Sequence, residues 1–107
     1  MGATKSDFFS DQQNEMAQLL KALAHPARIA IVEYLLNVDS CICGDIVNEL
    51  PLAQPTVSQH LKELKNANII QGTIEGTSIC YCLNSETIAL LEAFFGGISN
   101  KLKNKCC

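Results

Sequence analysis

Six cysteines occur as three close pairs in this chain of 107 residues. The pairs are Cys41 with Cys43, Cys80 with Cys82, and Cys106 with Cys107. Paired thiols can bind a soft metal ion, sense an oxidant, or simply pack as small apolar side chains. A domain of this length folds without a metal or disulfide, so a thiol site here would serve function. Thiolates select soft ions such as arsenite, antimonite, cadmium or copper(I) over magnesium or calcium.

The spacing of Cys41 and Cys43 carries a mechanical consequence. A short helix is predicted from about Cys43 to Leu50, ending before Pro51. Residues i and i+2 lie about 200° apart around a helix, so both thiolates can hold one ion only if the first turn unwinds. Ion binding at this pair would therefore distort the helix.

The other two cysteine pairs are candidate sources of a further sulfur. Cys106 and Cys107 end the chain, and a frayed terminus can reach a distant site, even across a dimer. Cys80 and Cys82 share one face of a predicted strand, with about 6.6 Å between their α-carbons, so they can also chelate an ion. Because that face is expected to be the outer face of a hairpin, we interpret this pair as a bystander.

Capping signals, proline and apolar periodicity predict the elements that position these residues. Ser10 and Gln13 form a capping box that begins a first helix. His25-Pro26 ends that helix and begins a second one, which runs to about Leu36. After the short helix already described, Pro55 lies in the first turn of a fourth helix.

The last third of the chain predicts a hairpin and a final helix. The β-branched segments "IIQGTI" and "TSICYCL" flank a turn at Glu75-Gly76, and Ser85 is expected to cap the final helix. The first and last helices have more apolar surface than one small core can use, which predicts a homodimer interface. The alternative is that both helices close the core of the monomer. The predicted interface residues are Leu20, Leu23, Leu91, Phe95 and Ile98.

Two short helices joined by a few residues and followed by a hairpin are typical of a winged helix-turn-helix. The fold class is therefore mainly α with a small β-hairpin (α+β), with a helical dimer interface. On the fourth helix, Val57, Leu61 and Leu64 face inward and leave a polar face outward. The candidate DNA-binding residues on that face are Gln54, Thr56, Ser58, Gln59, Lys62 and Lys65.

These residue types suit the two kinds of contact that DNA offers. Glutamine can pair with adenine through two hydrogen bonds, hydroxyls serve bases or phosphates, and lysines contact phosphates. Arg28 is expected to add to the phosphate contacts, whereas His60 is interpreted as a packed, hydrogen-bonded histidine. An ordinary solvated helix face would look similar, so the preceding helix and the hairpin are what favour DNA.

Composition limits the remaining possibilities. With 48% hydrophobic and 18% charged residues, the chain fits one domain over residues 1–107, with a flexible start at 1–9 and a flexible tail at 103–107. The net charge of −3 gives no overall basic field, so a DNA site must be local. No segment is predicted to span a membrane, no secretory signal precedes the domain, and a cytoplasmic protein is expected.

Three stretches together resemble the ArsR/SmtB family of metal-responsive repressors, and most of all its arsenic-responsive members. They are "LKALAHPARIAIVEYL", "CICGDIVNELPLAQPTVSQHLKELKNANII" and "GTIEGTSICYCL", which lie within residues 15–95. The resemblance implies a homodimeric winged helix-turn-helix that binds double-stranded operator DNA and leaves it when a metal or thiol-reactive signal arrives. It implies no enzymatic activity and no organic cofactor.

The resemblance also bears on the inducer. Cys41 and Cys43 fall where the family's arsenic repressors carry a cysteine motif, but that motif's third ligand would fall at Ile46. The final helix lacks the aspartate and histidine ligands of the family's zinc and nickel sensors. The expected metal ligands are therefore Cys41 and Cys43 with Cys106 and Cys107, and the expected inducer is arsenite or antimonite, with cadmium or another soft ion as variants.

Alternative functions remain open at this point. One is a repressor on the same fold that responds to thiol oxidation or persulfidation instead of a metal. Another is a winged helix that binds a protein rather than DNA. A small thiol enzyme is disfavoured because the chain has no Cys-x-x-Cys and no phosphate-binding loop.

Overall fold

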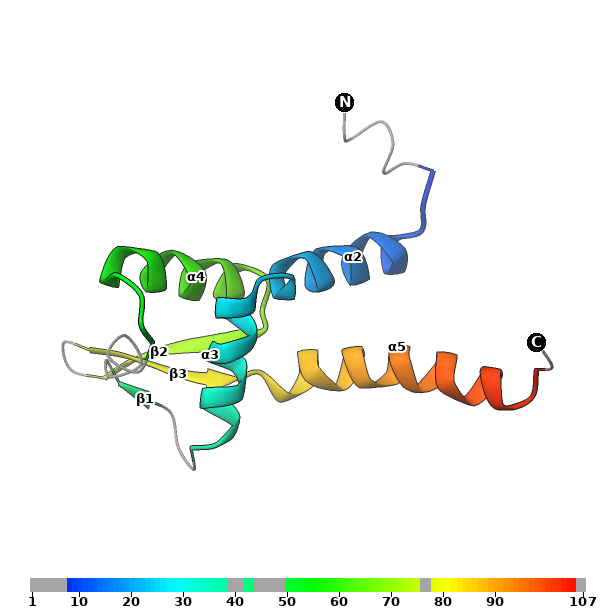
Figure 1. Ribbon diagram of the computed structural model, residues 1–107. Coiled ribbons are helices and arrows are strands. Elements are labelled where there is room, and N and C mark those ends of the chain that lie inside the picture. The colour runs from blue at the N-terminus through cyan, green and yellow to red at the C-terminus, as the bar shows by residue number, and fades with distance from the viewer. Residues whose placement is uncertain (1–7, 39–41, 44–49, 76–77, 106–107) are drawn as a thin grey trace.

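The computed structural model describes residues 8–38, 42–43, 50–75 and 78–105. The side chains of residues 42, 43, 74, 75, 78 and 79 lie outside the description. In chain order the elements are α2 (Asp11–Leu23), α3 (Pro26–Leu36), β1 (Ile42–Cys43), α4 (Gln54–Asn66), β2 (Ile70–Glu75), β3 (Ser78–Leu83) and α5 (Ser85–Lys103) (Figure 1). The four longer helices and the hairpin predicted from the sequence are confirmed.

Local capping explains where the first two helices begin. The Ser10 hydroxyl accepts a hydrogen bond from the Gln13 amide and the Gln13 side chain accepts one from the Ser10 amide, each 3.0 Å long. The predicted capping box is therefore present. At the start of α3, the His25 ring accepts a 3.0 Å bond from the Ala27 amide, while Pro26 occupies the first turn.

The sheet contains a strand where the sequence predicts the start of a helix. Its order is β1-β3-β2 with antiparallel pairing throughout, and Cys43 is paired with Cys80. The prediction that Cys43 begins a helix is wrong, because pairing with β3 holds this short segment extended. The remainder of the predicted helix, residues 44–49, lies outside the described residues. The unwinding mechanism derived from helical spacing therefore loses its basis at Cys43.

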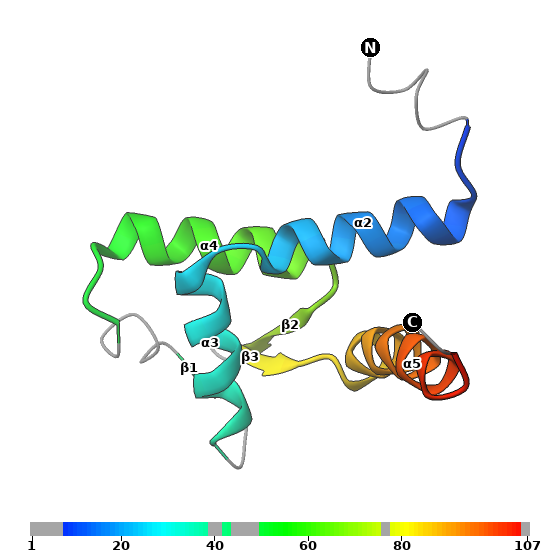
Figure 2. The ribbon, with the colours of Figure 1, turned by 45° about the vertical axis from the view of Figure 1, so that its right-hand side comes forward.

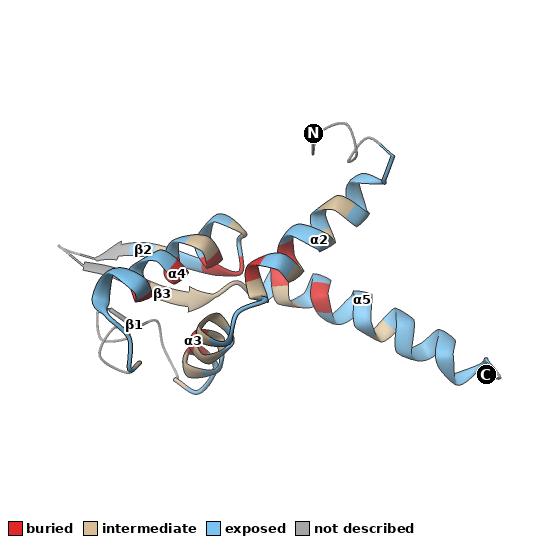
Figure 3. Ribbon diagram, turned by 45° about the horizontal axis from the view of Figure 1, so that its top comes forward, coloured by how far each residue is buried: buried red, intermediate tan, exposed pale blue. Residues whose placement is uncertain are grey.

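The hydrophobic core lies where α3 and α4 pack against the sheet. Ile31, Val57 and Leu64 are completely buried, together with Ile69 at the entry to β2. Figure 3 shows buried residues concentrated at this junction and at the near ends of α2 and α5. Between α4 and β2, Asn68 adopts a positive φ of 63°, a conformation that asparagine tolerates better than most residues. This turn directs the hairpin away from the end of α4.

Helices α2 and α5 extend away from the sheet (Figures 1 and 2). The radius of gyration is 16.4 Å, whereas a compact domain of 100 residues has about 13 Å. A groove of about 520 Å³ lies between the two helices and includes Met16, Leu90 and Phe94 in its lining. The alternative that both helices simply close the monomer core is therefore disfavoured.

The boundaries of α5 differ slightly from those predicted. Asn84, not Ser85, is the N-cap, and its side chain accepts a 3.1 Å bond from the Glu86 amide. The helix runs without a break through Gly96 and Gly97 and includes Lys103, the first residue of the expected tail. None of the helices in the described ranges combines the length and the apolar composition needed to cross a bilayer.

Candidate nucleic-acid interface and cysteine sites

Helix α4 separates a buried apolar face from an exposed polar one. Val57, Leu61 and Leu64 are buried, as the sequence predicts. All six candidate DNA-binding residues are exposed on the same helix: Gln54, Thr56, Ser58, Gln59, Lys62 and Lys65. Ser58, Lys62 and Lys65 follow one another at i, i+4 and i+7, which places them along one stripe. The structure therefore assembles a polar surface that can meet a nucleic acid.

Glu63 belongs to this surface, although the sequence analysis did not include it. One N–H of the Gln59 side chain donates a 3.0 Å hydrogen bond to the Glu63 carboxylate. The second N–H and the carbonyl oxygen of Gln59 are the two groups that adenine recognition needs. Glu63 thus orients Gln59 rather than blocking it. The i, i+4 spacing of the two residues is the sequence signal that could have revealed this bond.

Arg28 and His60 join the helices beneath the polar surface. Arg28 Nε donates a 3.1 Å bond to His60 Nδ1, and Arg28 Nη1 donates another to the Ala22 carbonyl. The prediction that His60 is packed and hydrogen-bonded is confirmed. Arg28, expected to contact phosphates, instead uses two of its N–H groups inside the protein to connect α2, α3 and α4.

The environment of His60 favours its neutral form. Its side chain is buried, and its ring centroid lies 4.3 Å from that of His25. Burial lowers the pKa of His60 below its usual value of 6.5, and the nearby His25 and Arg28 charges lower the pKa further. The neutral ring keeps Nδ1 free of a proton, which is the state that accepts the bond from Arg28.

The cysteines of β3 occupy a different environment from the one predicted. Cys80 has no exposed surface and Cys82 is half-buried, so Cys80 does not lie on an open outer face. Both are disulfide-bonded in the structure. The added strand β1 changes the prediction, since it pairs with β3 on the side away from β2. A two-residue strand leaves almost no periodic signal in a sequence.

The predicted metal ligands are only partly covered by the structure. The backbone of Cys43 lies in β1, while Cys41, Cys106 and Cys107 lie outside the described residues. Among the described side chains, no three His, Cys, Asp or Glu residues are grouped so as to hold a metal ion. The structure therefore pairs the backbone of Cys43 with that of Cys80. The roles of the other proposed ligands stay predictions.

Comparison with known proteins identifies a family that the chain resembles. Residues 25–71 match the model of "Bacterial regulatory protein, arsR family". The chain is 43% identical over 72 residues to the HTH-type transcriptional repressor SmtB of Mycobacterium tuberculosis, an alignment that covers 67% of this chain and 53% of the repressor. The chain thus spans about half the length of that relative.

Two further known proteins are matched over a larger share of their own length. An arsenical resistance operon repressor of Staphylococcus xylosus is 32% identical, with 67% of this chain and 68% of the repressor aligned. The solution structure of a homodimeric winged helix-turn-helix DNA-binding domain from Mycobacterium bovis superposes with a TM-score of 0.65 and 25% identity. That match covers 87% of this chain and 89% of the other. The winged helix-turn-helix fold is thereby confirmed, and the chain belongs to the arsR family of bacterial regulatory proteins.

Proposed function

We propose that the chain is a transcriptional repressor that binds double-stranded operator DNA through α4 and the β2–β3 hairpin. The observation that carries this proposal is the exposed polar face of α4, on which all six candidate residues lie. An α-helix fits the major groove, and a hairpin beside it can contact the neighbouring backbone or minor groove. The names of the SmtB and arsenical resistance relatives support a repressor rather than an activator.

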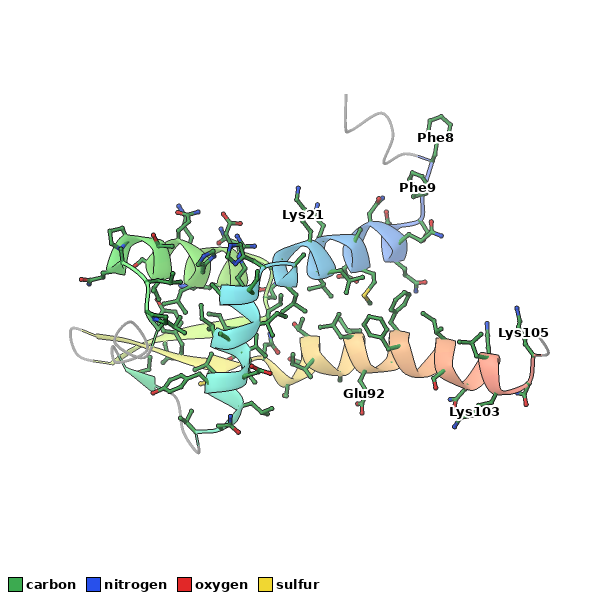
Figure 4. All side chains as sticks on the ribbon, viewed as in Figure 1. Phe8, Phe9, Lys21, Glu92, Lys103 and Lys105 are labelled. Carbon is green, nitrogen blue, oxygen red and sulfur yellow. The ribbon has the colours of Figure 1, made fainter. Side chains whose placement is uncertain are left out.

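The second part of the proposal is a homodimer formed through α2 and α5. Five large apolar side chains along α5 are between 40% and 59% exposed in the single chain: Leu90, Phe94, Phe95, Ile98 and Leu102. Glu92 points away from α2, while Lys103 and Lys105 lie at the far end of α5 (Figure 4). The apolar residues thus form a surface that a second copy can cover, and the similar domain of Mycobacterium bovis is homodimeric.

A dimer of this kind makes a geometric demand on the operator. Two α4 helices related by a two-fold axis enter successive major grooves about 34 Å apart. The operator is then an imperfect palindrome. Few basic residues lie on α4, so the affinity should be modest, and the salt dependence should come from the phosphate contacts of Lys62 and Lys65.

The proposed inducer is arsenite, or another soft thiophilic ion such as antimonite or cadmium. Cys41 and Cys43 are the primary proposed ligands, with Cys106 and Cys107 as the source of a further sulfur. Support comes from thiolate softness and from the arsenical resistance repressor among the relatives. Coupling of about 1–3 kcal/mol, or 5- to 150-fold in affinity, suffices for induction.

A second candidate signal is thiol oxidation or persulfidation. The specific observation that favours oxidation is that Cys80 and Cys82 are disulfide-bonded. Both signals act on cysteine sulfurs. Their effects on operator binding can therefore be compared on one protein preparation.

Selection and binding experiments test the proposed function. A duplex selected from a random DNA pool by the reduced protein should contain an inverted repeat, and anisotropy should then give a specific affinity at least a thousand-fold above that for unrelated DNA. Arsenite should lower that affinity. Failure to select any sequence would contradict operator binding, and equal affinity with and without arsenite would contradict the proposed inducer.

A further inference from the structure

Strand β3 lies in the centre of the sheet and carries two cysteines on one face. Cys80 and Cys82 alternate with Tyr81 and Leu83, which pack against the hydrophobic core. Residues directly opposite each other on neighbouring strands share a face of the sheet. On one side of β3, Cys80 is paired with Thr73 of β2, and on the other side it is paired with Cys43 of β1.

We propose that Cys43 and Cys80 form a redox-active disulfide that connects β1 to the hairpin. This inference rests on the proposed function, since it assigns the oxidant response of the repressor to a particular pair. It differs from the ion site proposed above, in which Cys43 acts with Cys41. The oxidant class is a peroxide.

Backbone geometry makes this pair suitable for a disulfide. Directly opposed α-carbons in an antiparallel ladder lie about 4.5–5.5 Å apart. That range falls within the roughly 4.4–6.8 Å that disulfides span, so the bond needs no backbone movement. The disulfide-bonded state of Cys80 in the structure agrees with this assignment. In the register of β1 and β3, Cys43 is the residue that stands opposite it.

The oxidation proceeds in two steps, one at each thiol. We assign the first step to Cys43 and the second to Cys80. The Cys43 thiolate displaces water from hydrogen peroxide after proton transfer and becomes a sulfenic acid. The Cys80 thiol then attacks that sulfur, a second water leaves, and the disulfide forms. Two thiols and one peroxide thus give one disulfide and two waters, and a dithiol reductant reverses the change by exchange.

The bond would act on both parts of the DNA-binding surface. Strand β1 has only two residues, so its hydrogen bonds alone hold it weakly to β3. A covalent link at Cys43 ties the segment that leads into α4 to the second strand of the hairpin. Adjustment of α4 against the hairpin is then restricted. We expect the oxidised protein to bind its operator at least five-fold more weakly than the reduced protein.

Disulfide mapping and operator binding test the inference on the full chain. The protein is reduced, treated with hydrogen peroxide, alkylated and digested, and a peptide linking Cys43 to Cys80 is expected by mass spectrometry. Linkage of Cys80 to any cysteine other than Cys43 would overturn the proposal.

Variants separate this site from the rest of the molecule. Cys43→Ser and Cys80→Ala should bind operator like the reduced wild type and lose the five-fold response to peroxide. A Cys106→Ser/Cys107→Ser variant is the matched control and should keep it. Cys80→Ala retains an apolar side chain in the buried position, and Cys43→Ser provides an independent reading if the alanine variant folds poorly. A full peroxide response in Cys43→Ser would overturn the proposal.

The two proposals fail in distinguishable ways. If the reduced protein selects no operator, the repressor function fails, while the mapped Cys43–Cys80 peptide still decides the disulfide. If the reduced protein binds an operator but the oxidised protein binds it equally well, the redox role fails and the repressor function stands.

Discussion

Arg28 Nε donates a 3.1 Å hydrogen bond to Nδ1 of His60, and this bond joins α3 to the buried face of α4. The guanidinium also donates to the Ala22 carbonyl at the end of α2. One side chain thereby connects α4 to both preceding helices. The buried residues Val57, Leu61 and Leu64 hold the same helix against the core.

The first prediction is that protein stability falls on mild acidification because of His60. Its pKa is lowered in the folded state, so below its usual value of 6.5 the unfolded chain binds more protons than the folded one. The free energy of unfolding should then decrease as the pH is lowered, by at most about 1.4 kcal/mol per pH unit for one proton. From about one pH unit above 6.5 upward, this residue should contribute no pH dependence, because it is then unprotonated in both states. Urea unfolding between pH 5.5 and 7.5 measures the effect.

His60→Asn provides the control for this prediction. The asparagine oxygen can accept the bond from Arg28 near the place of Nδ1, but it does not titrate. The variant should therefore show a flatter dependence of stability on pH over the same interval. A wild type and a variant with parallel pH profiles would contradict the assignment to His60.

The second prediction separates sequence recognition from general affinity on α4. Gln59→Ala should relax base preference at one position in each half-site, at a cost of about 1–3 kcal/mol on the preferred sequence. Lys62→Ala should weaken all sequences alike and reduce the salt slope by about one. Affinities for a panel of singly mutated operators at several salt concentrations provide the measurement. An equal loss on every duplex for both variants would refute the division of roles.

Glu63→Met examines how Gln59 is held. This substitution removes the oxygen that accepts the 3.0 Å bond, while an unbranched side chain of similar length remains. If Glu63 orients Gln59, base preference should loosen at the same operator position as in Gln59→Ala. A uniform rise in affinity without a change in preference would instead show that Glu63 acts only by repelling phosphates.

The described elements show which features could be predicted from the sequence. Helices α2 and α3 were predictable because the capping box and Pro26 act within a few residues. Strand β1 was not, because it exists through pairing with β3, about 38 positions away in the chain. Alternation also placed Cys80 on an open face, whereas the structure buries it completely. The bond between Gln59 and Glu63 is indicated by their i, i+4 spacing alone.

The third prediction is that a charge on the outer face of α5 dissociates the dimer. Phe95 is 52% exposed in the single chain, so Phe95→Glu should leave the monomer core intact and place a carboxylate in the proposed interface. Light scattering at micromolar concentration should show a dimer for the wild type and a monomer for the variant. Leu36→Glu, at an exposed position on α3, is the matched control and should remain dimeric. A monomeric wild type would refute the interface.

The fourth prediction is that arsenite and peroxide act on one shared residue, Cys43. Cys41→Ser and Cys43→Ser should each keep operator binding and lose release by arsenite. If Cys106 and Cys107 supply a further sulfur, replacing both should weaken arsenite binding but spare the peroxide response. By linkage, bound operator should weaken arsenite binding by the same factor that arsenite weakens operator binding.

Pre-oxidation distinguishes one shared cysteine from two separate sites. A Cys43–Cys80 disulfide removes the Cys43 thiolate, so the oxidised protein should bind arsenite at least ten-fold more weakly until a dithiol restores it. Calorimetric titration of arsenite before and after peroxide, with re-reduction as the third arm, gives this comparison on one preparation. In Cys80→Ala the same treatment should leave Cys43 as a sulfenic acid instead of a disulfide, which mass spectrometry distinguishes and a dithiol again reverses. Undiminished arsenite binding by fully oxidised wild type would place the ion away from Cys43, with Cys106 and Cys107 as the remaining proposed ligands.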